Sequence, residues 1–156
     1  MIIISVNKGV FHKGEIMVDH LSDYAKQALD SACNFSNTLG QGYIGSEHLL
    51  YGILSCDGSV GAELLKGRGA DLKNMESVIG ASSPVLGHLA ATHTDMTPNL
   101  KRILELSADF ASKQGSEKVG TEHLLHGILE SGTGAACRIL SYCGISKEEL
   151  KEDLRL

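Results

Sequence analysis

Two short segments of the chain place a hydroxyl, a carboxylate and an imidazole in the same order. They are Ser46-Glu47-His48 and Thr121-Glu122-His123, and both continue with Leu-Leu, one variable residue and Gly-Ile-Leu. We expect each segment to begin a helix that its hydroxyl caps, because a helix start offers unpaired N–H groups and a positive dipole end to an anion. A carboxylate in the first turn can instead pair with a guanidinium. The segments therefore predict pockets for a ligand that carries both an anionic group, such as a phosphate, and a guanidinium.

A purely structural interpretation of the same residues stays open. Glutamate is common in the first turn of a helix because it favours the dipole, and Ser or Thr caps occur throughout proteins. His48 and His123 lie next to leucine pairs, which favours packing and hydrogen bonding over ligand contact.

Catalytic and metal sites are not indicated. His123 and His126 share a helix face, but the HExxH order of a zinc site is absent. In the first copy, Tyr51 stands at the position equivalent to His126. The chain contains neither a GxSxG elbow nor a Walker GxxxxGK[ST] loop. We expect no catalytic residue and no metal ion, and no ATP hydrolysis by this chain.

The two segments belong to a repeat with a spacing of 75 residues. Its register holds without a gap, so that Lys26 matches Lys101 and Phe35 matches Phe110. A period of this length favours two packed copies over a solenoid array.

Each copy predicts four helices. Apolar residues between 21 and 39 follow the three-and-four spacing of an amphipathic helix, and Thr97-Pro98 opens the equivalent helix of the second copy. Ser146 and Glu149 form a capping-box pattern, and Asp71 is the matching cap in the first copy. The fold class is therefore all-α, with two four-helix repeats packed into one eight-helix domain and no convincing strand.

The domain is expected to span residues 18–156. Its parts are repeat one (19–80), a Ser, Pro and Gly-containing linker (81–95) and repeat two (96–156). Residues 1–17 form an N-terminal extension. It is either a small hairpin or a mis-annotated start with Met17 as the native first residue, because Lys13 to Glu15 can be encoded by a purine-rich run resembling a ribosome-binding site.

Composition excludes several partners. The formal charge is −5, no Lys or Arg run occurs, and aromatic residues are scarce, so nucleic acid is not expected to bind. No apolar run is long enough to span a membrane or to act as a signal peptide. The four cysteines fit neither a zinc nor a CxxC spacing, which favours reduced, mostly buried thiols in a cytoplasmic protein.

The doubled G-x-[ST]-E-H-L-L-x-G-I-L motif, with Thr97-Pro98 and Ile103-Leu104-Glu105-Leu106-Ser107, resembles the N-terminal domain of Clp-family AAA+ unfoldases. The similarity is closest to the ClpC branch and covers residues 18–156. It implies a pseudo-twofold domain that sits above an ATPase ring. This domain would receive MecA-type adaptors and unfolded or marked substrates, which are then passed on to a Clp protease. We expect the isolated domain to be a monomer.

In the ClpC branch these helix starts bind phosphoarginine, a mark for degradation. The resemblance implies that Glu47 and Glu122 pair with the guanidinium, and that Ser46, Thr121 and the following N–H groups, with His48 and His123, complete two equivalent phosphate pockets. Two pockets in one chain would add avidity. Ser46 departs from the usual Thr, and Leu21-Ser22-Asp23-Tyr24 departs from the usual Arg-rich opening.

The ATPase modules of the family are missing from this chain, so no cofactor is expected here and ATP would bind only in those absent modules. The leading interpretation is a substrate-binding and adaptor-binding domain. The alternative is a stand-alone accessory subunit that binds the Clp protease assembly without recognising phosphoarginine.

Overall fold

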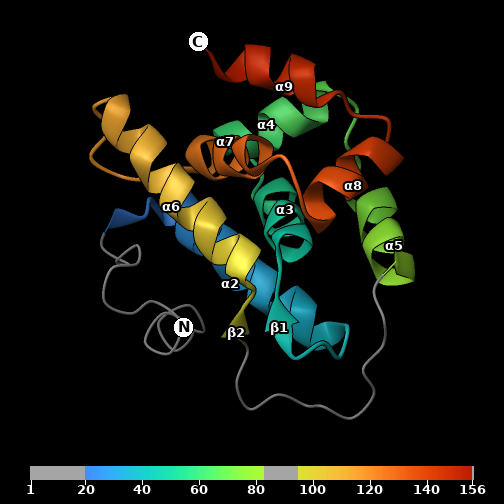
Figure 1. Cartoon of the computed structure of the whole chain (residues 1–156). Helices are drawn as coiled ribbons and strands as arrows, with labels where there is room; N and C mark the ends of the chain where they lie inside the picture. The colour runs from blue at the N-terminus through green and yellow to red at the C-terminus, as the bar shows by residue number, and fades with distance from the viewer. Residues whose placement is uncertain (1–19, 83–94, 156) are drawn as a thin grey trace.

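The computed structural model describes residues 20–82 and 95–155, and within them it contains eight α-helices (Figure 1). The all-α, two-repeat prediction is therefore confirmed. The helices are α2 (Asp23–Thr38), α3 (Ser46–Ser55), α4 (Val60–Gly67), α5 (Leu72–Ser82), α6 (Pro98–Lys113), α7 (Thr121–Ser131), α8 (Ala135–Tyr142) and α9 (Lys147–Leu154). Because α5 ends at Ser82, it enters the predicted linker. The predicted hairpin, the proposed start at Met17 and most of the linker lie outside the described residues.

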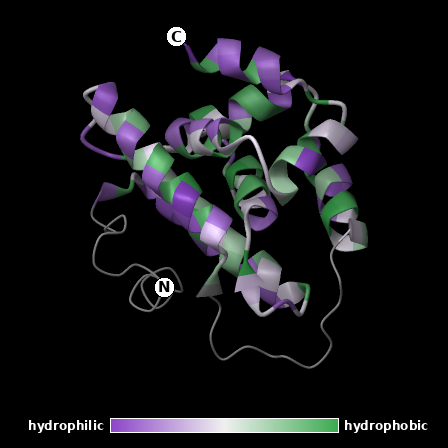
Figure 2. Ribbon diagram, in the orientation of Figure 1, coloured by the Kyte–Doolittle hydropathy of each residue, from purple (hydrophilic) through white to green (hydrophobic). Residues whose placement is uncertain are grey.

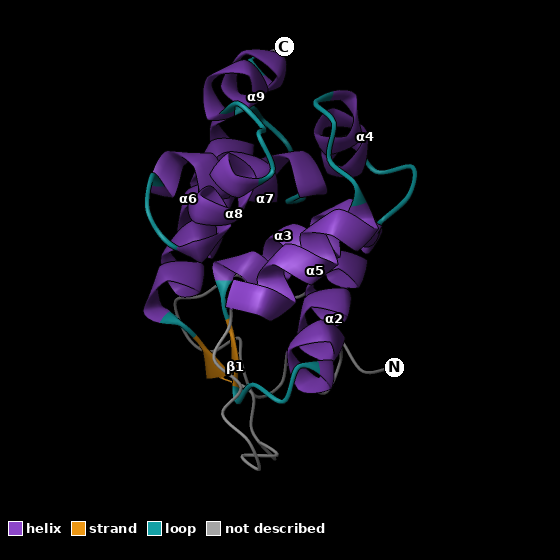
Figure 3. Cartoon of the chain, turned by 90° about the vertical axis from the view of Figure 1, so that its right-hand side faces the viewer, coloured by secondary structure: helices purple, strands orange, loops and turns teal. Residues whose placement is uncertain are grey.

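Helices of the two repeats correspond one to one. The starts of α2, α3, α4 and α5 each lie 75 residues before the starts of α6, α7, α8 and α9. In Figures 1 and 3, α3 and α7 lie at the centre, and the longer α2 and α6 flank them. The motif helices are thus the inner helices of the domain.

Several helix starts follow the predicted capping. The Thr97 hydroxyl accepts a hydrogen bond from the Leu100 N–H at 3.1 Å, and Pro98 occupies the first helical turn. The Asp71 carboxylate accepts from the Asn74 N–H at 2.9 Å. At α9 the capping box is only half formed: Ser146 accepts from the Glu149 N–H at 3.2 Å, whereas the Glu149 carboxylate accepts from Arg68.

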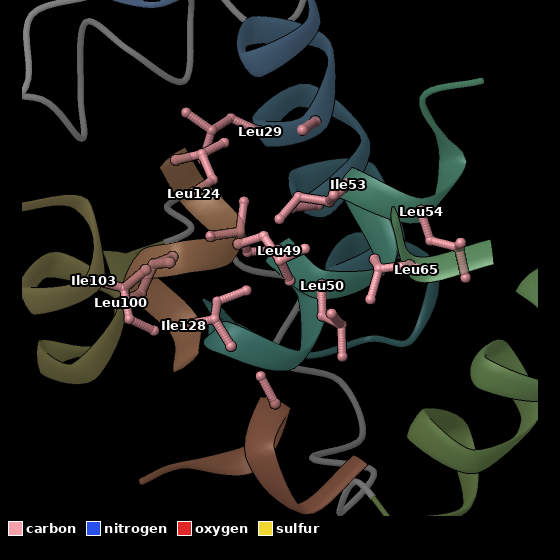
Figure 4. Packing of buried hydrophobic residues seen from close by; sticks show 14 of the residues in the cluster. Leu29, Leu49, Leu50, Ile53, Leu54, Leu65, Leu100, Ile103, Leu124 and Ile128 are labelled. Atoms are coloured by element: carbon pink, nitrogen blue, oxygen red, sulfur yellow. The ribbon is translucent and has the colours of Figure 1, made fainter. Parts of the chain in front are cut away.

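One hydrophobic core joins both repeats (Figure 4). Leu49, Leu50 and Ile53 of α3 are fully buried in it. Figure 2 shows the contrast between this mostly hydrophobic central helix and the mostly hydrophilic outer helix α9. A Cβ atom added at Gly52 would overlap the Ala28 carbonyl oxygen, so glycine is what allows α3 to lie so close to α2. Gly127 plays the same part between α7 and α6.

Short parallel pairings correct the expectation that the repeats contain no strand. Strand β1 (Tyr43–Ile44) pairs with β2 (Asp95–Met96), and Leu21 forms an equivalent isolated bridge with Val119. Each pairing joins the segment before the motif helix of one repeat to the segment before the first helix of the other. Backbone pairing therefore joins the two repeats at two equivalent places, one on each side of the pseudo-twofold axis.

Candidate functional site

Both motif helices begin with a glycine cap and a histidine. The N-cap residues are Gly45 and Gly120, not the expected Ser46 and Thr121. Nδ1 of the histidine at the third helical position accepts a hydrogen bond from the N-cap N–H, at 2.8 Å in both His48 and His123. The imidazole thus takes the place that Glu or Gln has in an ordinary capping box.

The second ring nitrogen of each histidine is also engaged. Nε2 of His48 lies 2.5 Å from the Gln41 amide oxygen, and Nε2 of His123 lies 3.0 Å from that of Gln114. Because Nδ1 accepts, Nε2 carries the proton and donates it to the amide oxygen. Burial lowers the pKa of His48 to about 4 and also lowers the pKa of His123, so both rings are neutral. These histidines pack and cap, as the structural interpretation expected.

The hydroxyls of Ser46 and Thr121 turn away from their own helices. Ser46 Oγ accepts a hydrogen bond from the Ala136 N–H at 3.0 Å, and Thr121 Oγ1 accepts from the Gly61 N–H at 2.8 Å. Ala136 and Gly61 lie in the first turns of α8 and α4, so each hydroxyl caps a helix of the other repeat. All four residues are buried, and these hydroxyls have a structural partner already.

The carboxylates of Glu47 and Glu122 fold back over the caps of their helices. A Cβ atom at Gly45 or Gly120 would overlap a carboxylate oxygen of Glu47 or Glu122, so a larger residue at either cap would displace that carboxylate. Among the described residues, neither carboxylate forms an ion pair with a lysine or arginine. Both lie near a histidine Nδ1, at 3.9 and 3.8 Å, but those nitrogens are unprotonated acceptors.

The two carboxylates differ in their surroundings. The Glu47 side chain is only 10% exposed, whereas the Glu122 side chain is 31% exposed. Burial raises the pKa of Glu47, while a hydrogen bond from its own backbone N–H and the positive charge of Arg138 act in the opposite direction. The predicted equivalence of the two pockets therefore does not extend to their solvent exposure.

A cavity of about 170 Å³ adjoins Glu47. It lies between the start of α3 in repeat one and helix α8 of repeat two, which supplies Arg138 and Tyr142. Tyr142 is 78% exposed, the largest exposure among the described residues with large apolar side chains. The Glu47 pocket, as we call this cavity, thus combines an acidic and a basic group with an aromatic rim.

A wider hollow of about 500 Å³ adjoins Glu122. Its charged lining consists of Glu122, Glu117 and Lys118, and its apolar lining includes Tyr24 and Val60, which are both exposed. This Glu122 pocket also joins the two repeats, because α2 and α4 come from repeat one. All three exposed large apolar side chains of the described residues therefore line one of the two pockets.

Comparison with known proteins identifies the fold and the repeat together. The family model of the Clp repeat N-terminal domain matches residues 20–143 and again residues 95–156. The chain belongs to this family. It is 30% identical over 154 residues to the chloroplastic chaperone ClpC1 of Oryza sativa subsp. japonica, covering 95% of the chain and 16% of that relative. It is 31% identical over 139 residues to ClpC1 of Arabidopsis thaliana, covering 86% of the chain and 14% of the relative.

Solved Clp N-domains share the fold at lower identity. The N-terminal domain of ClpD from Arabidopsis thaliana superposes with a TM-score of 0.73 at 18% identity, covering 90% of this chain and 96% of that one. The ClpV N-domain in complex with a VipB peptide gives a TM-score of 0.66 at 19% identity, covering 90% and 91% of the two chains. The full-length relatives are much longer, since this chain spans 14 to 16% of the two ClpC1 proteins.

Other chemistry is not indicated in the part of this Clp N-domain that the structure describes. No group of His, Cys, Asp or Glu residues there could hold a metal ion, and no helix is long and apolar enough to cross a membrane. All four cysteines are free thiols, three of them buried.

Sequence reasoning missed the pocket residues that come from the other repeat. Arg138, Tyr142, Val60 and Tyr24 belong to helices whose packing the sequence pattern did not reveal. The glutamines behind the histidines were missed for a different reason. Gln41 and Gln114 are 73 positions apart, so the spacing of 75 that defines this Clp repeat does not connect them.

Proposed function

We propose that this Clp N-domain captures phosphoarginine-marked or unfolded proteins, and adaptors of the MecA type, for a Clp protease assembly. The observation that carries the proposal is the pair Glu47 and Glu122. Each carboxylate lines a hollow at the junction of the repeats, and within the described residues neither forms a salt bridge with a lysine or arginine.

The carboxylates suit a guanidinium ligand for a physical reason. A desolvated carboxylate without a cation is unfavourable, and an incoming guanidinium both neutralises it and donates parallel hydrogen bonds. Glu47, with its side chain only 10% exposed, stands to gain most from such a partner.

The phosphate needs a different partner from the one that sequence reasoning assigned. The hydroxyls of Ser46 and Thr121 already accept hydrogen bonds from Ala136 and Gly61. Arg138 in the Glu47 pocket and Lys118 in the Glu122 pocket bring a positive charge to the lining instead. We assign the phosphate contacts to these two side chains.

Peptide docking is supported by the exposed apolar residues beside both carboxylates. Tyr142 borders one pocket, and Tyr24 and Val60 border the other. Aromatic side chains beside charged groups are typical anchors in protein interfaces. A related N-domain, that of ClpV, has been solved with a VipB peptide.

Calorimetric titration with free phosphoarginine tests the proposal, with arginine and inorganic phosphate as comparison ligands. We expect binding of phosphoarginine and a loss of about tenfold or more in the double variant Glu47→Gln/Glu122→Gln, because charge-assisted hydrogen bonds are removed. Glu130→Gln, exposed near the far end of α7, is the matched control. Absence of binding by the wild type, together with retained association with a Clp ATPase, would favour the accessory-subunit alternative.

A further inference from the structure

The two pockets share some equivalent positions of the repeat but differ in the charged residues around them. Glu47 corresponds to Glu122, and Tyr43 corresponds to Lys118, each 75 residues apart. The equivalent of Arg138, which lines the Glu47 pocket, is Glu63 on α4. Glu63 is not itself among the lining residues of the Glu122 pocket, but it lies about one helical turn after Val60, which is, so the corresponding helix carries the opposite charge there.

In the Glu47 pocket an acidic and a basic group face one cavity without a direct salt bridge, an arrangement complementary to a zwitterion. Neither Arg138 nor the buried Glu47 carboxylate forms a salt bridge with a lysine, arginine or carboxylate among the described residues, although the positive charge of Arg138 acts to lower the pKa of Glu47. Both nevertheless line the same cavity of about 170 Å³. A ligand with a guanidinium and a phosphate would give the buried Glu47 carboxylate and the exposed Arg138 guanidinium a direct counter-ion each. The burial of Glu47 strengthens the interaction at its end of the pocket.

The Glu122 pocket lacks this match. Its cation, Lys118, is a point charge without the planar fork that binds phosphate with two hydrogen bonds. A second carboxylate, Glu117, lines the same hollow and repels an anion. The hollow is also wider, at about 500 Å³, and Glu122 is more exposed than Glu47, so solvent screens the charges more strongly.

We propose that Arg138 is the specificity-determining residue that confines phosphoarginine to the Glu47 pocket, so that one chain binds one phosphoarginine rather than two. The Glu122 pocket is left for the other parts of a docked protein. This inference rests on the proposed function and replaces its two equivalent sites by one selective site.

The test is the stoichiometry of phosphoarginine binding to the whole chain, measured by titration calorimetry. We expect one equivalent for the wild type and a loss of about tenfold or more in affinity for Arg138→Glu, which copies the residue of the other repeat. Arg138→Lys keeps the charge but not the fork, and we expect an intermediate affinity. Because Arg138 is exposed, these changes leave the core intact, which thermal unfolding verifies.

The reciprocal variant Glu63→Arg supplies the matched control. It should leave the first site unchanged and raise the affinity of the Glu122 pocket enough to reveal a second equivalent. Two equal sites in the wild type, wild-type affinity in Arg138→Glu, or a single equivalent in Glu63→Arg would each overturn the inference while leaving phosphoarginine recognition itself established. No binding of phosphoarginine by the wild type would overturn both.

Discussion

The hydroxyl of Thr121 accepts a hydrogen bond from the backbone N–H of Gly61, 60 positions earlier in the chain, at 2.8 Å. The bond satisfies an N–H group in the first turn of α4 that has no partner within its own helix. Thr121, a residue of the predicted ligand site, therefore forms one of the hydrogen bonds that hold the two repeats together.

Removing this hydroxyl should destabilise the domain. In Thr121→Val the shape of the side chain is nearly kept, but the buried Gly61 N–H loses its acceptor, so we expect the free energy of unfolding to fall by about 1 to 3 kcal/mol. Thr121→Ser, which copies Ser46 of the other repeat, keeps the hydroxyl and should cost clearly less. Urea unfolding followed by circular dichroism measures both, and equal losses would contradict the role of the hydrogen bond.

Acidification should weaken the fold through His48. Its pKa is about 4 in the folded chain and 6.5 without the fold, so between these values the unfolded chain binds more protons and stability falls as the pH falls. The full effect of this group is about 3 kcal/mol. The raised pKa of Glu47 acts with the opposite sign at the acidic end of this range.

His48→Gln isolates the contribution of the imidazole, because glutamine keeps an acceptor for the Gly45 N–H but does not titrate. We expect a smaller difference in urea stability between pH 7 and pH 5 for this variant than for the wild type. His20→Gln is the control, since His20 is exposed. An unchanged pH dependence in His48→Gln would contradict the neutral, buried imidazole.

Close contact between α2 and α3 predicts a strong effect of a single methyl group. Gly52→Ala places a Cβ atom against the Ala28 carbonyl oxygen, and we expect a loss of about 1 to 3 kcal/mol in unfolding free energy. Gly67→Ala meets no atom within 4 Å and should be neutral or stabilising by up to about 1 kcal/mol. Thermal unfolding of the two variants compares the same substitution in filled and open space.

Thiol reactivity should single out Cys143. Cys33, Cys56 and Cys137 are buried, whereas Cys143 is partly exposed. With Ellman's reagent under native conditions we expect one thiol to react ahead of the others, and four after denaturation. The rate should rise with pH, because burial raises the pKa of the Cys143 thiol and only the thiolate attacks. Loss of the early phase in Cys143→Ser identifies the residue.

Much of the fold could be predicted because most helices are indicated by patterns among residues that are close in the sequence. The amphipathic spacing of α2 and the Thr97-Pro98 start of α6 depend only on neighbouring residues. The paired strands could not be predicted, because two residues such as Tyr43 and Ile44 carry no alternating pattern.

The site was predicted less completely than the fold. Glu47 and Glu122 were singled out by their place in the motif, and each lines a pocket, while their contact with a ligand stays a prediction. The cap was assigned to the wrong residues because a hydroxyl before a helical pattern is the usual signal, whereas here His48 and His123 reach back to the glycine N–H groups. Arg138 was invisible because its place beside Glu47 depends on how one repeat packs against the other.

The exchange of contacts between repeats has a kinetic consequence. Helical domains fold fast when their contacts are local in the chain, and loop closure slows them when contacts are distant. Here the bond from Ala136 to Ser46 bridges 90 positions, and the Gly61 to Thr121 bond bridges 60. The starts of α4 and α8 are completed only when the other repeat has packed against them, so this small helical domain should assemble more slowly than its helix content alone would suggest.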